Sequence, residues 1–438
     1  MFTSESFGIF VLIENRIYMN RIILTGNGFD LAHNLPTSYR HFIDWYWNDW
    51  KKKLKTGKKI IENPLLYIDN RTHYTVWDIL LRSSEYIDSF SGHEFGEKIL
   101  KSKSAFGQYF SIQPCRFLQK ICQSIETKGW VDIENEYYKQ LVECSKGSDS
   151  ELHLALNKQF GYLQELLAQY LSSLSLEYIQ VNDEIKKIIY SPINPRDISV
   201  SQKEVISTHA DYWVNCDRMI FVNKLSRYKT YQKCLDDQWN YNESSNEPIS
   251  EVDLDNVYIN YPTFFLPDNI MVLNFNYTNL PNHYIEDDNP IFKVCNIHGE
   301  LEEPKKIIFG YGDDLDDSYK MISTLNDNDY LKHFKSIKYL ESDRYRKTLQ
   351  FIDSAPYQVF IMGHSCGNSD RTLLNTLFEH KNCVSIKPYY YKDGEKDNYL
   401  DIVQNISRNF TNTKLMRDRV VNKTYCEAFS KRDKQTDK

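Results

Sequence analysis

Five residues of this chain combine chemistry with position, because each follows a run that predicts a buried β-strand. Gly26 and Gly28 end the first run, and a glycine pair there can let a phosphate approach backbone N–H groups. Asn274 and Asn276 alternate at the end of a later run, so two amides on one face could hold a sugar or a water molecule. His298 ends a third run, where an imidazole can act as a general base near neutral pH. Each motif has an alternative that involves no ligand: a tight turn at the glycines, an Asn turn at Asn274 and Asn276, and a structural role for His298.

The first turn continues through residues that could add contacts to a ligand. Asn27, Phe29 and Asp30 share this turn with the two glycines, and Asp30 could hydrogen-bond ribose hydroxyls or simply cap the next turn. The dinucleotide fingerprint needs a third glycine, but position 31 is leucine. We therefore predict ligand binding at this turn without a complete fingerprint.

A late segment, Gly363-His364-Ser365-Cys366-Gly367, matches the G-x-S-x-G pattern of a hydrolase nucleophile. That chemistry needs an acid and then a histidine further along, but the only later histidine, His380, falls in the helix that the motif would start. We instead expect Gly363 to allow close approach of a ligand and Ser365 to donate a hydrogen bond to it. Ser369 or Asp370 should cap the following helix.

Metal chemistry has one candidate segment, FGYGDDLDD, with carboxylates at Asp313, Asp314, Asp316 and Asp317. A paired-carboxylate site for a nuclease or another hydrolase could lie there. A solvated acidic loop is the interpretation we favour. The nine cysteines contain no C-x-x-C pair, so a structural zinc site is not expected, and we predict no metal.

The elements that would position these residues can be read from hydrophobic patterns. A short strand at 22–24 is followed by a glycine turn and by a helix that starts near Tyr39. Helical patterns dominate 71–265, where one apolar stripe runs from Phe160 to Leu174. Runs rich in Val, Ile and Phe then predict buried parallel strands at 269–278, 291–299, 305–312 and 357–365. In such sheets ligands bind at the carboxyl ends of the strands, so the candidate residues should meet there.

Composition limits the classes of partner. The chain has 438 residues, which favours two subdomains, and its net charge of −7 without a basic stripe argues against nucleic-acid binding.

The two ends of the chain carry separate signals. Residues 431–438 are predicted to form a frayed terminus. The apolar run at 7–13 is too short for a membrane span and lacks signal-peptide features, and Met19 suggests that 1–18 is an extension or a misassigned start. The cysteines are scattered along the chain and their total is odd, which fits reduced thiols and a cytoplasmic location.

Ordered motifs at both ends of the chain resemble the AbiH family of bacteriophage abortive-infection proteins. These motifs are GNGFDLAHNLPTSYRHF, NFNYT, IHGEL, FGYGDD and GHSCGNSD, with a looser match in WVDIENEY at 130–137. The resemblance implies an effector of antiviral defence. A phage trigger or a partner defence protein is then expected, and self-association is an open alternative.

The same motif order is similar to the sirtuin-like NAD-binding fold. This second resemblance implies an α/β fold with a Rossmann-like parallel sheet of sirtuin type and a large helical insertion. It implies that Gly26 and Gly28 meet the dinucleotide, that Asn276 and His298 serve catalysis, and that Gly363 and Ser365 lie near the adenosine. Asp30 and Thr278 depart from the sirtuin pattern at positions where sirtuins contact the ribose and nicotinamide. The missing zinc ribbon argues against deacetylation and for hydrolysis of NAD.

We therefore predict an antiphage effector that hydrolyses NAD to nicotinamide and ADP-ribose. The alternative is a sensor or switch that binds a nucleotide without turning it over. The predicted organisation places the nucleotide-binding core at 19–70 plus 266–412, the helical insertion at 71–265 and a C-terminal tail at 413–438. The predicted cofactor-binding set is Gly26, Asn27, Gly28, Phe29, Asp30, Asn274, Gly363, Ser365 and Asp370.

Overall fold

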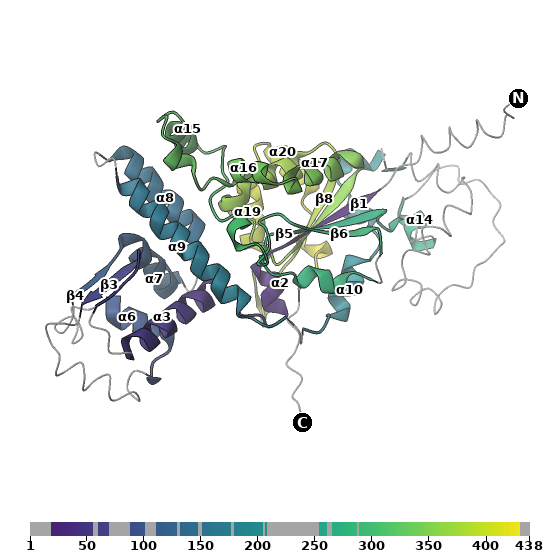
Figure 1. The fold of residues 1–438 in the computed structure, drawn as a ribbon. Helices are drawn as coiled ribbons and strands as arrows, with labels where there is room; N and C mark the ends of the chain where they lie inside the picture. The colour runs from purple at the N-terminus through teal and green to yellow at the C-terminus, as the bar shows by residue number, and fades with distance from the viewer. Residues whose placement is uncertain are drawn as a thin grey trace, which may run out of the picture.

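The computed structural model describes most of the chain outside four longer gaps. The described residues are 19–55, 60–69, 88–100, 111–128, 132–147, 151–176, 179–204, 206–207, 254–260, 265–286 and 289–429. The predictions for 1–18, for a surface loop at 244–253 and for 431–438 lie outside them. Figure 1 shows a lobe built on a central sheet and a second lobe built mainly of helices.

Five parallel strands form the central sheet; four of them lie in predicted runs, and the fifth, β8 (Cys383–Tyr389), was not predicted. They are β1 (Asn20–Thr25), β5 (Asn269–Asn274), β6 (Phe292–Asn296), β7 (Tyr357–Met362) and β8, in the order β6-β5-β1-β7-β8. In chain order this is 3-2-1-4-5, the doubly wound arrangement. The direction of winding reverses between β1 and β7, whose register pairs Asn20 with Tyr357 and Leu24 with Ile361.

Helices cover both faces of the sheet. The side chains of each strand alternate between the two faces and pack against these helices. Ile22 and Leu24 pack in the same core cluster as side chains of α17 (Arg344–Ser354), α18 (Arg371–Glu379) and α19 (Tyr399–Asn409). Ile23 packs on the other face with α2 (Asn27–Ala32) and α10 (Asp183–Ile189). α20 (Thr413–Arg419) also contacts β8, so the described part of the predicted tail belongs to this lobe.

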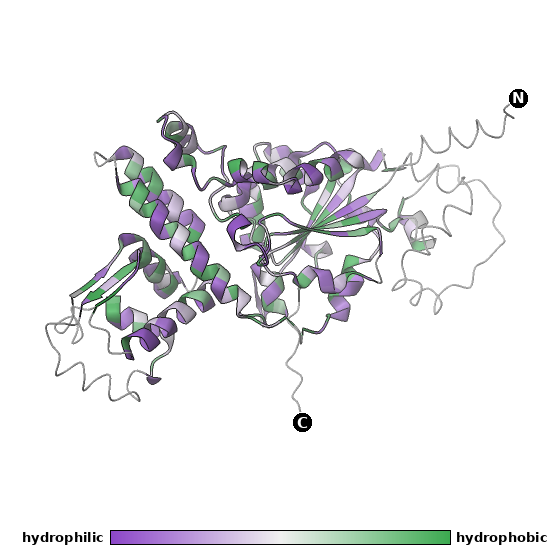
Figure 2. Ribbon diagram, viewed as in Figure 1, coloured by the Kyte–Doolittle hydropathy of each residue, from purple (hydrophilic) through white to green (hydrophobic). Residues whose placement is uncertain are grey.

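The helical lobe has a core of its own. It comprises α3 (Tyr39–Lys55), α6 (Gly92–Leu100), α7 (Arg116–Lys128), α8 (Ile133–Lys146) and α9 (Leu152–Ser172), with a three-stranded antiparallel sheet of β2 (Ile60–Glu62), β3 (Leu66–Asp69) and β4 (Ser111–Pro114). Figure 2 shows hydrophobic and hydrophilic residues alternating along α8 and α9, as expected for helices with one buried face. The buried stripe of α9 includes Phe160 and Leu163, as the sequence predicts.

A long excursion from the sheet lobe packs onto this helical core. Phe309, Tyr311, Tyr330 and Phe334 belong to the same buried cluster as α8 and α9. The strand predicted at 305–312 is wrong: a 3₁₀ turn at Pro304–Lys306 is followed by irregular chain, and Tyr311 makes one isolated bridge to Phe334. The apolar side chains in this run serve the helical core and not a sheet.

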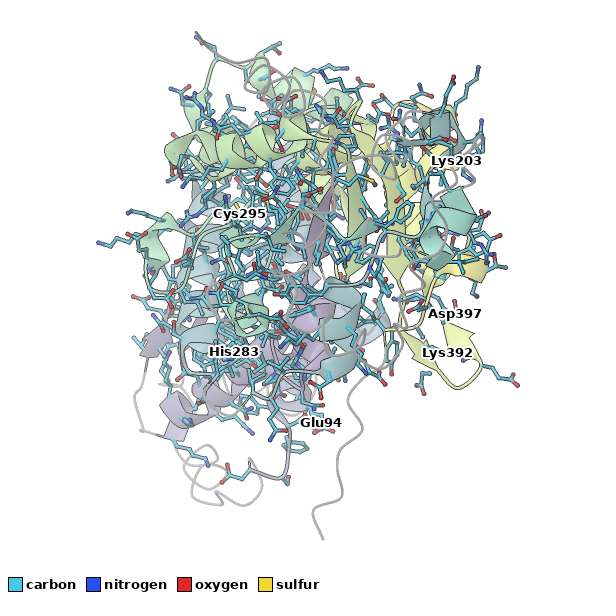
Figure 3. The ribbon with its side chains drawn as sticks, turned by 90° about the vertical axis from the view of Figure 1, so that its right-hand side faces the viewer. Glu94, Lys203, His283, Cys295, Lys392 and Asp397 are labelled. Atoms are coloured by element: carbon cyan, nitrogen blue, oxygen red, sulfur yellow. The ribbon has the colours of Figure 1, made fainter. Side chains whose placement is uncertain are left out.

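The remaining elements are short. α14 (Leu254–Asn260) packs beside the central sheet, α15 (Asp317–Ser323) packs on the helical core, and α16 (Lys335–Lys338) follows the excursion. β9 (Lys392–Asp393) pairs with β10 (Lys396–Asp397). Figure 3 shows this hairpin projecting from the surface, with Lys392 and Asp397 on its two strands. None of the helices in the described ranges combines the length and the apolar character that a bilayer crossing requires.

Candidate functional site

A cavity of about 560 Å³ lies at the carboxyl ends of the central strands. We call it the strand-end cavity. Its walls come from the turns after β1, β5, β6 and β7 and from α3, α8 and α9 of the helical lobe. It includes the turns after β1 and β7, which flank the point where the winding reverses and where doubly wound sheets bind ligands. The volume is within the range of small-molecule sites.

Glycines are required here because two turns are packed backbone to backbone. A Cβ on Gly363, whose φ is +76°, would lie 2.0 Å from the Phe29 nitrogen, and a Cβ on Gly26 would lie 2.7 Å from the His364 Cα. The Gly28 N–H donates to the Gly363 carbonyl at 2.8 Å. The Gly28 N–H therefore does not bind a phosphate in this structure. The group that lies close to the Gly26 and Gly28 backbone is the turn after β7, and not a ligand.

Asn274 and Asn276 have different surroundings. Asn274 is fully buried at the end of β5, where its amide donates to Asn296 Oδ1 and the Thr278 carbonyl, and it accepts from Thr25. Asn276 lines the cavity, and its Nδ2 donates to the Gly26 carbonyl at 2.8 Å. Asn274 thus fastens neighbouring strand ends together, and only Asn276 can reach a ligand in the cavity.

Asp30 is the acid of the turn after β1, and its surroundings shift its pKa. Its carboxylate accepts from Asn276 Nδ2 at 2.9 Å and from Thr278 Oγ1 at 2.9 Å. Burial raises the pKa of the Asp30 carboxyl to about 7, although these hydrogen bonds oppose the shift. A carboxyl group with this pKa can exchange a proton near neutral pH, which is a property of functional sites.

His298 lines the cavity but both ring nitrogens already have partners. Nδ1 lies 3.2 Å from the Phe275 carbonyl, and Nε2 lies 3.2 Å from Tyr339 Oη and 3.2 Å from Asp370 Oδ1. Burial and the nearby Lys335 ammonium lower the pKa of His298. This shift favours the neutral imidazole, which is the form that a general base needs.

A buried charge network joins the two lobes behind His298. Lys335 Nζ donates to Asp370 Oδ1 at 2.8 Å and lies 3.1 Å from Glu134 Oε1, and its side chain is fully buried. Burial alone would raise the pKa of Asp370, but Lys335 and His298 hold it well below its usual value. Burial instead raises the pKa of Glu134, so Asp370 is the better partner of Lys335. Asp370 occupies the N-cap position of α18 without a side-chain cap bond, and Ser369 makes none either, so the predicted capping role is wrong.

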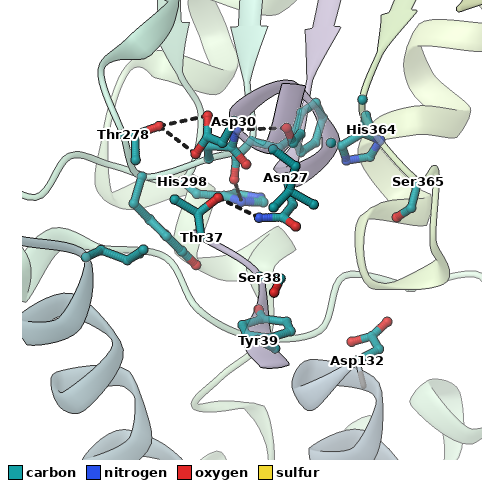
Figure 4. A pocket seen from close by; sticks show the side chains of 18 of the residues that line it. Asn27, Asp30, Thr37, Ser38, Tyr39, Asp132, Thr278, His298, His364 and Ser365 are labelled. Atoms are coloured by element: carbon teal, nitrogen blue, oxygen red, sulfur yellow. Dashed lines mark hydrogen bonds between the residues drawn. The ribbon is translucent and has the colours of Figure 1, made fainter. Parts of the chain in front are cut away.

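Asp132 reaches the same cavity from the start of α8. Its carboxylate caps the helix by accepting from the Asn135 N–H at 2.9 Å. Figure 4 shows Asp132 facing the cavity from the helical lobe, opposite Asp30, Thr278 and His298. Burial raises the pKa of Asp132. The wall thus contains the carboxyl groups of Asp30, Asp132 and Glu134, which in their ionised forms would favour ligands or transition states with cationic character.

The G-x-S-x-G segment does not form a nucleophile–base pair. Ser365 lines the cavity, but within the described chain no histidine nitrogen bonds its hydroxyl. His364 Nδ1 accepts from the Cys366 N–H at 3.1 Å. Besides Gly363, the residue of the turn with a positive φ is Cys366, at +54°, and its side chain is fully buried. The arrangement gives no support to a hydrolase elbow, and ligand binding by this loop stays a prediction.

The acidic segment after Tyr311 makes protein contacts. Asp313 is buried and pairs with Arg371 at 3.1 Å, and Asp314 accepts from Ser336 at 2.8 Å. Asp316 caps α15, and only Asp317 is fully exposed. The expectation of a solvated loop is therefore wrong for Asp313, because the segment runs between the two lobes.

Most of the predicted binding residues meet in the strand-end cavity. Its lining includes Gly26, Asn27, Gly28, Asp30, Asn276, His298, Gly363, Ser365 and Asp370. Phe29 does not line it, because its ring packs on His33, Tyr284 and Phe429. Sequence reasoning missed Lys335 and the acids Asp132 and Glu134. WVDIENEY carries both acids, whereas no motif marks Lys335.

The strand order and the cavity at its reversal point define a doubly wound α/β protein. A family model described as "Bacteriophage abortive infection AbiH" matches residues 22–391. The match covers most of the chain, so the chain belongs to the AbiH family, and the motif-based assignment is confirmed. This membership implies a role in abortive infection by bacteriophage. No curated protein and no solved structure matched the chain.

Proposed function

We propose that this AbiH protein is an antiphage effector that hydrolyses NAD to nicotinamide and ADP-ribose at the strand-end cavity, on a sheet of sirtuin type. One observation carries the proposal. The reversal point of a doubly wound sheet opens into a cavity whose wall combines a buried imidazole that favours its neutral form, an amide and a carboxyl group with a pKa of about 7. The location supports dinucleotide binding, and the side chains supply proton transfer and positioning.

The chemistry breaks the bond between the ribose C1′ and the nicotinamide nitrogen, and a water oxygen forms the new bond to C1′. The electron pair of the broken bond leaves with nicotinamide, which departs neutral because its ring nitrogen was cationic. The ribose passes through an oxocarbenium-like state, as in glycoside hydrolysis. The carboxyl groups of Asp30, Asp132 and Glu134 that line the cavity would stabilise that positive charge when ionised.

The proton of the attacking water would pass to Nε2 of His298. Asp370 Oδ1 lies 3.2 Å from that nitrogen and would stabilise the imidazolium that forms. Asn276 uses its Nδ2 on Gly26 and Asp30, and among the described residues none donates to its Oδ1. That oxygen is available to orient a water or a ribose hydroxyl.

The direct test incubates purified full-length protein with NAD and follows nicotinamide release by chromatography. His298→Ala and Asn276→Ala should each reduce release by about 10²-fold or more, because each removes a group that acts on the water. Asp317→Asn, at the exposed start of α15, is the matched control and should retain full activity. Release that is unaffected by both site substitutions would place the chemistry elsewhere.

A nucleotide-binding sensor is the second candidate, and the lobe-bridging network favours it. Lys335 and Asp370 of the sheet lobe meet Glu134 of the helical lobe beside the cavity, so a ligand that altered this contact would be sensed by both lobes. Such a protein would show a higher melting temperature with NAD or ADP-ribose while the nucleotide stays intact. Consumption of NAD that depends on His298 would exclude this candidate.

A further inference from the structure

A buried histidine of the helical lobe has two carboxylates beside it, away from the strand-end cavity. His153 lies in the first turn of α9. Asp327 is the N-cap of the 3₁₀ turn η5 (Asn328–Leu331), and Asp329 is the second residue of that turn. One ligand atom from each of the three residues lies within 4.8 Å of the other two. From this grouping we infer that His153, Asp327 and Asp329 form a binding site for a divalent transition-metal ion.

The histidine supplies the observation that separates this group from an ordinary acidic surface. His153 is only 3% exposed, and neither ring nitrogen makes a hydrogen bond within the described chain. Asp327 Oδ2 lies 3.1 Å from Nε2, but the contact lacks hydrogen-bond geometry. Buried polar atoms are almost always hydrogen-bonded, and an ion is one of the partners that accounts for an exception. Two ligands bound at about 2.1 Å to one ion also stand about 3 Å apart.

Neighbouring contacts hold the His153 ring, the Asp327 carboxylate and the backbone of Asp329 in place without using the ligand atoms. The ring of His153 stacks on Tyr330 with centroids 4.1 Å apart. Asp327 uses Oδ1 to accept from the Asp329 N–H at 3.0 Å, which leaves Oδ2 directed at the histidine. Asn157, one turn after His153, donates to the Asp329 carbonyl at 2.7 Å. Such supporting contacts are typical of built metal sites, because they fix the orientation of the ligands.

The donor set selects the class of ion. One imidazole and two carboxylates suit Zn²⁺, Mn²⁺, Fe²⁺ or Co²⁺, whereas Ca²⁺ and Mg²⁺ prefer oxygen ligands alone. The side chain of Asp327 is 40% exposed, so solvent can reach the site and complete the coordination. An ion held by three protein groups with an open position exchanges with solution, and a chelator should remove it.

The ion would fasten the excursion 307–334 to the first turn of α9. This excursion leads directly into Lys335, whose ammonium contacts Asp370 and Glu134 beside the strand-end cavity. Metal binding would therefore stabilise the chain that delivers Lys335 to the cavity. The site does not depend on the chemistry proposed above, since none of its three residues lines that cavity.

The test uses chelator-treated full-length protein titrated with Co²⁺, followed by visible absorption and by melting temperature. Wild type should bind one ion per chain, melt at a higher temperature with Co²⁺, and show no thiolate charge-transfer band. Asp327→Asn and Asp329→Asn should each weaken binding at least about tenfold. Both substitutions affect partly exposed side chains, and asparagine can still cap η5, so the metal-free variants should keep the wild-type fold by circular dichroism.

His380→Gln is the matched control, because His380 pairs with Asp353 at 3.2 Å and has no third ligand in the groups found among the described residues. It should bind Co²⁺ as wild type does. Three results would each overturn the inference: no Co²⁺ bound by wild type, equal binding by wild type and both Asp variants, or a spectrum dominated by thiolate bands. Any of them would leave His153 as a simple ion-pair partner of Asp327.

Discussion

Two clusters of buried charge lie at opposite ends of the parallel sheet, and they differ in what surrounds them. The first is near the amino ends of the strands, where Arg21 of β1 is fully buried. Its guanidinium donates to the carbonyls of Ile189 and Ser191 at 2.8 and 2.7 Å and to Gln358 at 3.2 Å. Close by, Lys387 pairs with Asp197 at 3.1 Å. None of these residues lines the strand-end cavity, so their contacts hold α10 and the strands together.

The second cluster is at the carboxyl ends and consists of Glu134, Lys335, Asp370 and His298. Lys335 is as deeply buried as Arg21, but three of its neighbours form part of the wall of the strand-end cavity. Its two carboxylates also come from different lobes. The comparison separates a buried charge whose neighbours are purely structural from one that borders a cavity at the reversal point of the sheet. We expect only the second to belong to a functional site.

The largest effect should follow removal of the cation from the cavity cluster. Lys335→Met leaves Asp370 and Glu134 buried without a counter-charge, which should cost about 3–5 kcal/mol of unfolding free energy and abolish NAD turnover. Arg21→Met should cost a similar amount of stability but leave turnover per folded molecule unchanged. Urea unfolding beside the nicotinamide assay measures both. Loss of turnover in Arg21→Met would erase the distinction between the clusters.

The glycine contact between the two turns should give the next effect. Gly363→Ala combines a positive φ with a Cβ placed 2.0 Å from the Phe29 nitrogen, so it should lower stability by about 2–4 kcal/mol. Gly394→Ala is the matched control, because its φ of +58° is also left-handed but nothing lies within 4 Å of the added Cβ. It should cost about 1 kcal/mol. Equal unfolding midpoints for the two variants would show that the turns can separate freely.

Asp30 should make stability depend on pH in a way that the amino-end cluster does not. Its folded-state pKa of about 7 exceeds the unfolded value of 3.8, so its contribution is present below about pH 4 and is lost as the pH rises through 7. The loss should be roughly 4 kcal/mol between pH 4 and pH 8. Asp30→Asn should remove this part of the slope, as measured by urea midpoints across that range. Glu134, whose pKa is also raised, titrates in both proteins and cancels in the difference. Identical slopes would mean that Asp30 does not titrate there.

The smallest effect should come from a neighbour of Asp30. Thr278→Val keeps the shape of the side chain but removes the donor that lies 2.9 Å from Asp30 Oδ2. The ionised form of Asp30 then loses about 1 kcal/mol of stabilisation, so its pKa rises further. The pH at which stability falls should move upward. A downward movement would contradict the assigned direction of the hydrogen bond.

Four strands of the parallel sheet and most of the cavity residues could be predicted because both depend on local patterns, whereas β8 was not predicted. Apolar runs predict strands, and the carboxyl ends of parallel strands meet at one edge, so the sequence alone groups Gly26, Asn276, His298 and Gly363. The strand predicted at 305–312 was wrong for a related reason. A short apolar segment is buried in either case, and its composition does not reveal whether a strand or a helix bundle covers it.

The other half of the site could not be predicted because it depends on contacts between distant segments. Glu134 meets Lys335 across the lobes, and their spacing in sequence carries no periodic signal. Nor could sequence alone show that Asn274 turns into the sheet while Asn276 faces the cavity, since β5 ends between them and strand alternation stops there.

The most direct test of the central claim is hydrogen exchange of the full chain with and without ADP-ribose, a stable product of the proposed reaction. The account predicts slower exchange at 26–30, 276–278 and 363–370, and unchanged exchange at 183–198 around the amino-end cluster. Protection that appears at the amino-end cluster, or nowhere in the described chain, would contradict the assignment of the strand-end cavity as the nucleotide site.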